Sequence, residues 1–201
     1  MGITIRSYTS VPVDEGEILR YAGVRPDGRE ENLALVRELL PAALSAMRYS
    51  VSYAEFEISR KENSLCLGFL NTDSKDLSKN LDGCDSVIAF AATVGIEMDR
   101  LIAKYSATSP ARALILQAIG AERIESLANL FSAEIAAEKA ALGQSLKPRF
   151  SPGYGDLPLE MQKNIFEALD CPRKIGLSLN ENLLMSPSKS VTAIIGVYSK
   201  R

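Results

Sequence analysis

Hydrophobic residues recur along this chain with two periods, one of two residues and one of three to four. Segments in which apolar residues alternate with polar ones, or fill the segment, predict strands over residues 3–8, 51–58, 65–70, 87–94, 183–185 and 191–198. Segments with helical spacing predict helices over residues 15–22, 30–47, 76–81, 96–105, 109–142 and 159–169. These elements do not alternate as regular βαβ units, which favours an α+β fold.

Local signals refine the predicted helices. Asp14 is suited to cap the first helix, because its carboxylate can accept hydrogen bonds from the first helical N–H groups. Pro41 is expected to kink or split the second helix. The longest predicted helix is either one amphipathic helix or two helices joined near Gly120, and Pro172 can start a further short helix.

Composition indicates an ordinary folded protein. The 201 residues are 46% hydrophobic and 24% charged, with no linker long enough to divide them, so we expect one domain over 1–201. A net charge of −2 offers no basic field to nucleic acid. No apolar run reaches the roughly 20 residues that span a bilayer, so no membrane contact is expected. Three widely spaced cysteines and the lack of a signal-peptide pattern fit the cytoplasm.

The absence of histidine narrows the possible chemistry. A chain without histidine has no Ser-His triad and no histidine metal ligand. Cys84 and Cys171 have no imidazole to activate them, so we expect inert thiols. Gly95 follows a buried strand, but a dinucleotide site would need a glycine-rich turn there. We expect no metal site, although a carboxylate site for a hard cation stays open.

Several carboxylates occur along the predicted helix over residues 109–142. They are Glu122, Glu125, Glu134 and Glu138. A di-iron bundle site would pair such residues with a Glu-x-x-His partner, which this chain lacks. We expect a solvated helix face, with Arg123 and Lys139 nearby.

Residues 149–156 combine several groups that suit a small ligand, in the sequence RFSPGYGD. Arg149 has a planar fork that fits a carboxylate or phosphate. Pro152 and Gly153 form a rigid turn with an open backbone, and the ring of Tyr154 can stack on a base or face a cation. An ordinary Pro-Gly turn with solvent-facing charges is the alternative interpretation.

A second polar segment, residues 185–192, has the sequence MSPSKSVT. It forms either a tight turn into the last strand or a loop beside residues 149–156 that offers hydroxyl groups to a ligand. The two segments together contain Arg-x-x-Pro-Gly-Tyr followed by Met-x-Pro-x-x-Ser-Val. In order, spacing and content this pair resembles the activation domain of cobalamin-dependent methionine synthase. The resemblance is clear over residues 87–198 and slight over residues 1–86.

The resemblance implies a single domain with a curved, mainly antiparallel sheet flanked by helices. It implies binding of S-adenosylmethionine, and docking on the cobalamin-binding part of methionine synthase after its cofactor has been oxidised. Reduction by one electron, typically from a flavodoxin-like donor, is then captured by methyl transfer from S-adenosylmethionine. The chain has no cobalamin-binding segment, so cobalamin would be carried by the partner and this chain would be an accessory protein. Whether it counts as an enzyme stays open.

The resemblance also implies roles for particular residues. Arg149 is expected to pair with the ligand carboxylate, and Tyr154 to pack near the sulfonium. Backbone groups of Ser151 and Gly153 are expected to bond the ligand. An N-terminal acid pairs with the ligand ammonium in the family, which makes Asp14 a candidate here, and Asp156 within residues 149–156 is a local alternative.

The chain departs from the family pattern in one informative position. Glu160 stands where fused enzymes usually carry a histidine, so a different polar contact with the cobalamin partner is expected. Two alternatives remain beside reactivation of methionine synthase. One is a non-catalytic adaptor that holds a corrinoid protein, and the other is a reactivator of another corrinoid methyltransferase.

Overall fold

A computed structural model describes residues 2–61 and 64–199, so the ends of the expected 1–201 domain lie outside the described residues. Its main feature is a five-stranded sheet with the order β1-β2-β6-β10-β7, in which each neighbouring pair is antiparallel. The strands are β1 (Thr4–Tyr8), β2 (Tyr49–Glu57), β6 (Ser86–Thr93), β10 (Ser190–Ser199) and β7 (Gln144–Leu146). The central strand β6 is buried from its second residue to its last, as its unbroken apolar sequence predicts.

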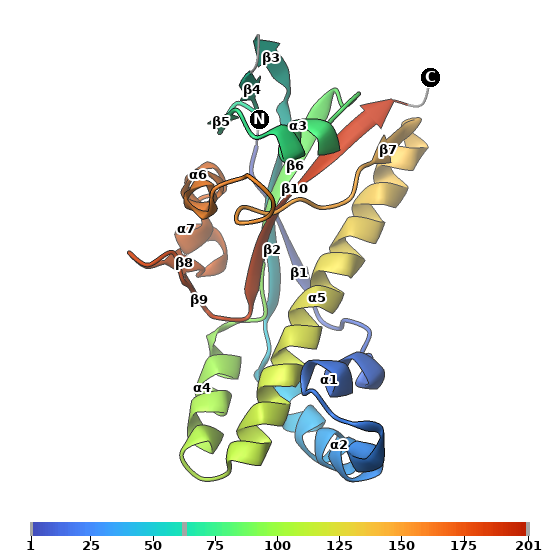
Figure 1. Ribbon diagram of the computed structural model, residues 1–201, viewed down its shortest axis with the longest axis vertical. Helices are drawn as coiled ribbons and strands as arrows, with labels where there is room; N and C mark the ends of the chain where they lie inside the picture. Colours follow the sequence, from blue (N-terminus) through green and yellow to red (C-terminus); the bar gives the residue numbers. More distant parts are fainter. Residues whose placement is uncertain (1, 62–63, 200–201) are drawn as a thin grey trace.

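Helix α5 (Pro110–Ala141) runs along one side of this sheet, and it is one continuous helix of 32 residues (Figure 1). The other helices of this half gather at one end of the molecule. They are α1 (Glu15–Tyr21), α2 (Arg29–Ala46) and α4 (Ile96–Ser106), with a 3-10 turn at Pro26–Gly28. Helix α2 also stays continuous, with Pro41 exposed inside it, so the expected split is absent there.

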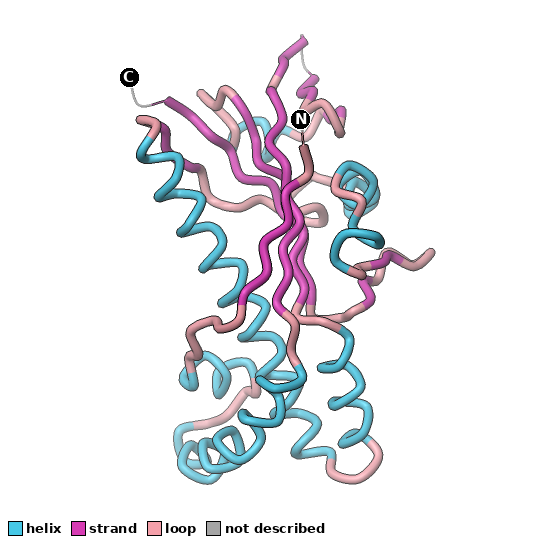
Figure 2. The backbone as a smooth tube through the Cα atoms, turned by 180° about the vertical axis from the view of Figure 1, so that it is seen from behind, coloured by secondary structure: helices cyan, strands magenta, loops and turns pink. Residues whose placement is uncertain are grey.

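The opposite side of the sheet is covered by shorter elements (Figures 1 and 2). The helices there are α3 (Lys75–Asn80), α6 (Gln162–Ala168), preceded by a 3-10 turn at Leu159–Met161, and α7 (Cys171–Ile175). The strands there form two small sheets, β3 (Ser59–Lys61) with β4 (Ser64–Cys66) and β5 (Asn71–Thr72), and β8 (Ser178–Leu179) with β9 (Met185–Ser186).

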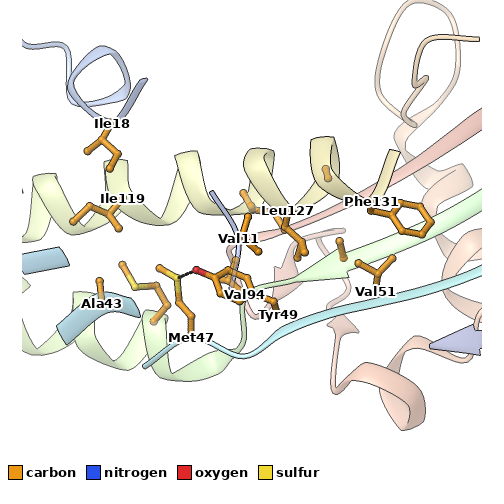
Figure 3. Close-up of a cluster of buried hydrophobic side chains, with 14 of the residues drawn as sticks. Val11, Ile18, Ala43, Met47, Tyr49, Val51, Val94, Ile119, Leu127 and Phe131 are labelled. Atoms are coloured by element: carbon orange, nitrogen blue, oxygen red, sulfur yellow. Dashed lines mark hydrogen bonds between the residues drawn. The ribbon is translucent and has the colours of Figure 1, made fainter. Parts of the chain in front are cut away.

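Two hydrophobic clusters fill the molecule, one on each side of the sheet. The larger lies between α5, the end helices and the sheet (Figure 3). In it Phe131 of α5 contacts the rings of Tyr53 and Phe90 edge-on or tilted, with centroids 5.0 Å apart in each pair. The Tyr49 hydroxyl is also buried here and donates to the sulfur of Met47 at 3.1 Å (Figure 3).

The predicted strands over residues 3–8, 51–58, 87–94 and 191–198 correspond to β1, β2, β6 and β10. Two short predictions were wrong in extent. Residues 65–70 form a strand only as far as Cys66, after which Leu67 N–H donates to the Leu70 carbonyl in a turn. At 183–185, Leu183 has a φ of +62° and forms part of the hairpin loop, so the strand begins at Met185. No helix of the described residues is long and apolar enough to span a bilayer.

Candidate functional site

Residues 149–156 are attached to the edge of the main sheet. Lys147 N–H donates to the Gly196 carbonyl at 2.9 Å, and Phe150 exchanges both backbone hydrogen bonds with Ile194 of β10 at 2.9 and 2.8 Å. The chain then leaves the strand edge and forms a compact turn, which we call the ligand loop (residues 149–156). Its attachment to β10 gives the loop a rigid base.

Arg149 connects the ligand loop to helix α5. Its Nη2 atom donates to Oε2 of Glu125 at 3.1 Å and to Oδ1 of Asn129 at 2.9 Å. The arginine side chain is 27% exposed and that of Glu125 is 43% exposed, so a ligand can reach both. Glu125 and Asn129 were not predicted as part of the site. Their i,i+4 spacing on one helix face is the signal that could have indicated it.

Tyr154 presents its ring to solvent at the tip of the ligand loop. It is 70% exposed, and it contacts Phe150 edge-on with centroids 5.5 Å apart. Phe150 is buried, so this contact fixes one edge of the tyrosine ring and leaves its faces accessible. The exposed faces of the ring are therefore free of contacts with Phe150.

The backbone of the ligand loop is partly occupied by its own turn. Gly153 N–H donates to the Leu157 carbonyl at 2.9 Å, and Tyr154 N–H donates to the Ser151 carbonyl at 3.1 Å. The predicted ligand contact at Gly153 therefore falls to its carbonyl group. Gly153 has a φ of +86°, a backbone conformation that residues other than glycine rarely adopt.

Asp156 contacts the beginning of α3. Its carboxylate accepts hydrogen bonds from Lys75 N–H at 2.8 Å and Asp76 N–H at 3.2 Å, and also from the Ser74 hydroxyl. These bonds, with the Ser74 hydroxyl first, lower the pKa of the Asp156 carboxyl. The carboxylate is thus engaged with the protein itself, which makes it a poor partner for a ligand ammonium.

Asp14 caps α1, as predicted, by accepting a hydrogen bond from Glu17 N–H at 3.0 Å. Its own N–H donates to Oε1 of Glu122 at 3.1 Å. Asp14 and Arg149 are therefore attached to neighbouring turns of α5, through Glu122 and Glu125. Among the described residues, no hydrogen bond joins Asp14 to Arg149 directly.

The prediction that α5 presents a solvated charged face was wrong for part of the helix. The side chains of Glu122 and Arg123 are 2% and 0% exposed and form an ion pair at 2.5 Å. Arg123 also donates to the backbone carbonyls of Val11, at 2.8 Å, and Pro12. Residues 11–14 cross α5 at this point and cover both charges.

The second motif is attached to α4 and β6. Both oxygens of the Asp99 carboxylate accept from Ser188, one from its N–H at 2.7 Å and one from its hydroxyl at 2.6 Å. Ser190 donates to the Thr93 hydroxyl at 2.9 Å. No hydrogen bond between described residues joins this segment directly to the ligand loop, so β10 is what links the two motifs.

The chemistry of the remaining groups is limited. Burial raises the pKa of the Cys84 thiol and raises that of Cys171 to about 12, which fits the prediction of inert thiols. Within residues 2–61 and 64–199, no cluster of three or more Cys, Asp and Glu side chains could hold a metal ion.

The fold and the ligand loop together define an α+β protein with an arginine and an exposed tyrosine beside a long helix. The family model for the activation domain of vitamin B12 dependent methionine synthase matches residues 59–200. The chain belongs to this family, which confirms the resemblance drawn from the two motifs.

Solved structures give the same result for the fold. The crystal structure of the MetH reactivation domain bound to AdoHcy has a TM-score of 0.68 and 16% sequence identity with this chain. The similarity covers 98% of this chain and 78% of that chain, so it includes the N-terminal third, where the sequence resemblance is slight. It confirms the predicted α+β fold with a curved, mainly antiparallel sheet. A search of curated proteins found no match.

Proposed function

We propose that this protein binds S-adenosylmethionine and acts as an accessory protein in the reductive reactivation of a cobalamin-dependent methionine synthase. Membership of the activation-domain family supports the reaction class. The observation that carries the ligand assignment is the partly exposed ion pair between Glu125 and Arg149, which lies in the same loop as the exposed ring of Tyr154.

This ion pair is complementary to the amino-acid end of S-adenosylmethionine. Both hydrogen bonds of Arg149 use Nη2, so a ligand carboxylate cannot bind the guanidinium in a bidentate way without displacing Glu125 or Asn129 from Nη2. A zwitterion resolves this competition, because its carboxylate can take Arg149 while its ammonium takes the released Glu125. We therefore favour Glu125 over Asp156 as the ammonium partner, and Asp14 remains the second candidate.

The other expected contacts follow from the ligand loop. The Ser151 and Gly153 backbone lies on the way from Arg149 to Tyr154, so it can bond the ligand between its charged end and its aromatic end. The exposed face of Tyr154 suits the sulfonium or the adenine.

The cobalt chemistry belongs to cobalamin held by the partner protein, and a flavodoxin-like protein is the proposed electron donor. This chain supplies the bound methyl donor and the surface that docks on the partner. Its own residues orient the ligand, and none of them needs to transfer a proton, which agrees with a chain that lacks histidine.

Calorimetric titration with two ligands tests the assignment. The first is S-adenosylmethionine, and the second is 5′-methylthioadenosine, which lacks the amino-acid carboxylate and ammonium. Arg149→Ala and Glu125→Gln should each weaken binding of S-adenosylmethionine by about tenfold or more, because a hydrogen bond to a charged group contributes roughly 1.5–3 kcal/mol. Binding of 5′-methylthioadenosine should change little. If the wild-type protein binds neither ligand, the proposal is wrong.

A reactivation assay separates the proposed role from the alternatives. The protein is added to a cobalamin-dependent methionine synthase inactivated by oxidation, with a reductant and S-adenosylmethionine. We expect recovery of activity with wild type and little with Arg149→Ala. Equal recovery with both would favour a non-catalytic adaptor, and recovery only with a different corrinoid methyltransferase would identify that class as the partner.

A further inference from the structure

Helix α3 contacts the ligand loop at both ends of the loop. Immediately before the loop's first residue, Asn80 at the end of α3 donates from Nδ2 to the Pro148 carbonyl at 3.3 Å. At the loop's end, Asp156 accepts the hydrogen bonds from Ser74, Lys75 and Asp76 described above. The two contacts use opposite ends of one helix of six residues.

The contact at the end of the loop is close as well as polar. Asp156 N–H donates back to Oδ2 of Asp76 at 3.3 Å, so the two aspartates are linked in both directions. A Cβ added at Gly155 would overlap the Asp76 carboxylate, so any side chain at this position would force the Asp76 carboxylate to move away from the loop. The negative charge of Asp156 also lies at the N-terminal end of α3, where the helix dipole favours it.

Helix α3 is itself fixed to the core. Leu77 and the adjoining Leu81 are fully buried in the hydrophobic cluster on this side of the sheet. The Ser74 hydroxyl takes part both in capping the helix and in holding the loop. It accepts a hydrogen bond from Leu77 N–H at 3.1 Å and donates one to Asp156. The loop is thus held by an element that cannot shift without disturbing the core.

We propose that α3 holds the ligand loop in its binding position, and that Asp156 and Asn80 are positioning residues for ligand binding. This inference rests on the proposed function, because the loop matters for the ligand only if Arg149 and Tyr154 bind it. Neither positioning residue touches the ligand. Each fixes one end of the loop, and together they set the distance and orientation between Arg149, held by α5, and the ring of Tyr154.

The test compares Asp156→Asn and Asn80→Ala with a matched control, Lys79→Gly. The control lowers the helix propensity of α3 at an exposed position and removes none of the contacts described here. Titration of the full chain with S-adenosylmethionine should show that Asp156→Asn and Asn80→Ala weaken binding by roughly tenfold, while Lys79→Gly changes it by less than about twofold. Equal losses in all three variants at equal melting temperature would overturn the proposal.

A double-mutant cycle adds a readout that a general structural role would not produce. If Asp156 acts through the position of Arg149, then Asp156→Asn should weaken binding much less in an Arg149→Ala background than in wild type. Additive losses would contradict a positioning role.

Amide hydrogen exchange without ligand keeps this proposal separate from the proposed function. The N–H groups of Tyr154 and Leu157, which form the turn of the ligand loop, should exchange faster in Asp156→Asn than in wild type or Lys79→Gly. That result would support the role of α3 in holding the ligand loop, whether or not S-adenosylmethionine binds. Unchanged exchange in Asp156→Asn would overturn the proposal that α3 holds the loop. Absence of ligand binding by wild type would overturn only the proposed function.

Discussion

The side chain of Lys189 lies across Gly120 of helix α5. A Cβ at Gly120 would be 2.9–3.1 Å from the Cγ, Cδ and Cε atoms of the lysine, which is too close for an unaltered arrangement. Burial lowers the pKa of the Lys189 ammonium, and the nearby charge of Asp99 partly opposes this effect. The glycine that suggested a joint in α5 is therefore a crossing point for a side chain, and the helix continues through it.

This crossing predicts a stability effect that depends on background. Gly120→Ala should gain about 1 kcal/mol from helix propensity, but in wild type this gain is offset because Lys189 must move. In a Lys189→Ala background the same substitution should show the full gain. Urea unfolding of the four proteins measures both effects. An equal effect of Gly120→Ala in the two backgrounds would mean that the lysine stem does not constrain residue 120.

The buried pair of Glu122 and Arg123 predicts a large effect from a single substitution. Arg123→Met leaves the Glu122 charge buried without its ion-pair partner and removes the donor to the Val11 carbonyl. We expect a loss of about 3–5 kcal/mol in the free energy of unfolding. Arg20→Met is the control, because Arg20 pairs with Glu17 on the surface and is 61% exposed.

For that control we expect a loss of no more than about 1 kcal/mol. The double variant Glu122→Gln/Arg123→Met removes both charges and should be less destabilised than the sum of the two single variants. Similar losses for Arg123→Met and Arg20→Met would show that the buried pair contributes no more than a surface pair.

Tyr154 predicts the opposite combination, a small effect on stability and a clear effect on binding. Its ring is 70% exposed and contacts Phe150, so Tyr154→Ala should cost at most about 1.5 kcal/mol of stability. Binding of S-adenosylmethionine should weaken by about twofold to thirtyfold, as expected for loss of a cation–π contact. Tyr21→Ala, at the partly exposed tyrosine of α1, should leave binding unchanged. Equal affinities of the two variants would remove Tyr154 from the site.

Local sequence signals predicted the parts of this fold that depend on neighbouring residues. The Asp14 cap is an interaction with Glu17, three residues away, and the burial of β6 follows from its own apolar sequence. Residues 149–156 stood out because their arginine, Pro-Gly turn and tyrosine lie together in the chain, and their pairing with residues 185–192 predicted the family that the family model confirms. In each case the physical cause lies within one turn or one strand.

The contacts that complete the site come from residues far apart in the sequence. Arg149 donates hydrogen bonds to Glu125 and Asn129, which lie 24 and 20 residues earlier in the chain. Asp156 accepts hydrogen bonds from the start of α3, 80 to 82 residues earlier. Arg123 is buried because a segment 111 to 112 residues earlier covers it. A helix face that reads as charged in sequence can therefore be interior, and only the tertiary arrangement shows this.

The cysteines predict selective thiol reactivity. Cys84 and Cys171 are buried, with raised pKa values, and that of Cys171 reaches about 12. At pH 8 both should be protonated and inaccessible, so a chromogenic disulfide reagent should modify them only after unfolding. Cys66 is only partly buried and should react first. Rapid modification of Cys66→Ser in the native state would contradict the assigned burial.

Asp156 predicts a specific dependence of stability on pH. Its hydrogen bonds to Ser74 and to the α3 backbone lower the pKa of its carboxyl in the folded state, while an unfolded aspartate titrates near about 3.9. A lowered folded pKa means that ionised Asp156 stabilises the fold above the unfolded pKa, and that this contribution is lost as the pH falls through the folded pKa. Wild type should therefore melt at a higher temperature than Asp156→Asn at pH 6, and the difference should shrink as the pH falls below about 4. Asp27→Asn, at an exposed turn, corrects for the change in net charge. A difference between wild type and Asp156→Asn that stays constant from pH 6 to pH 2.5 would show that the α3 contact does not depend on the carboxylate charge.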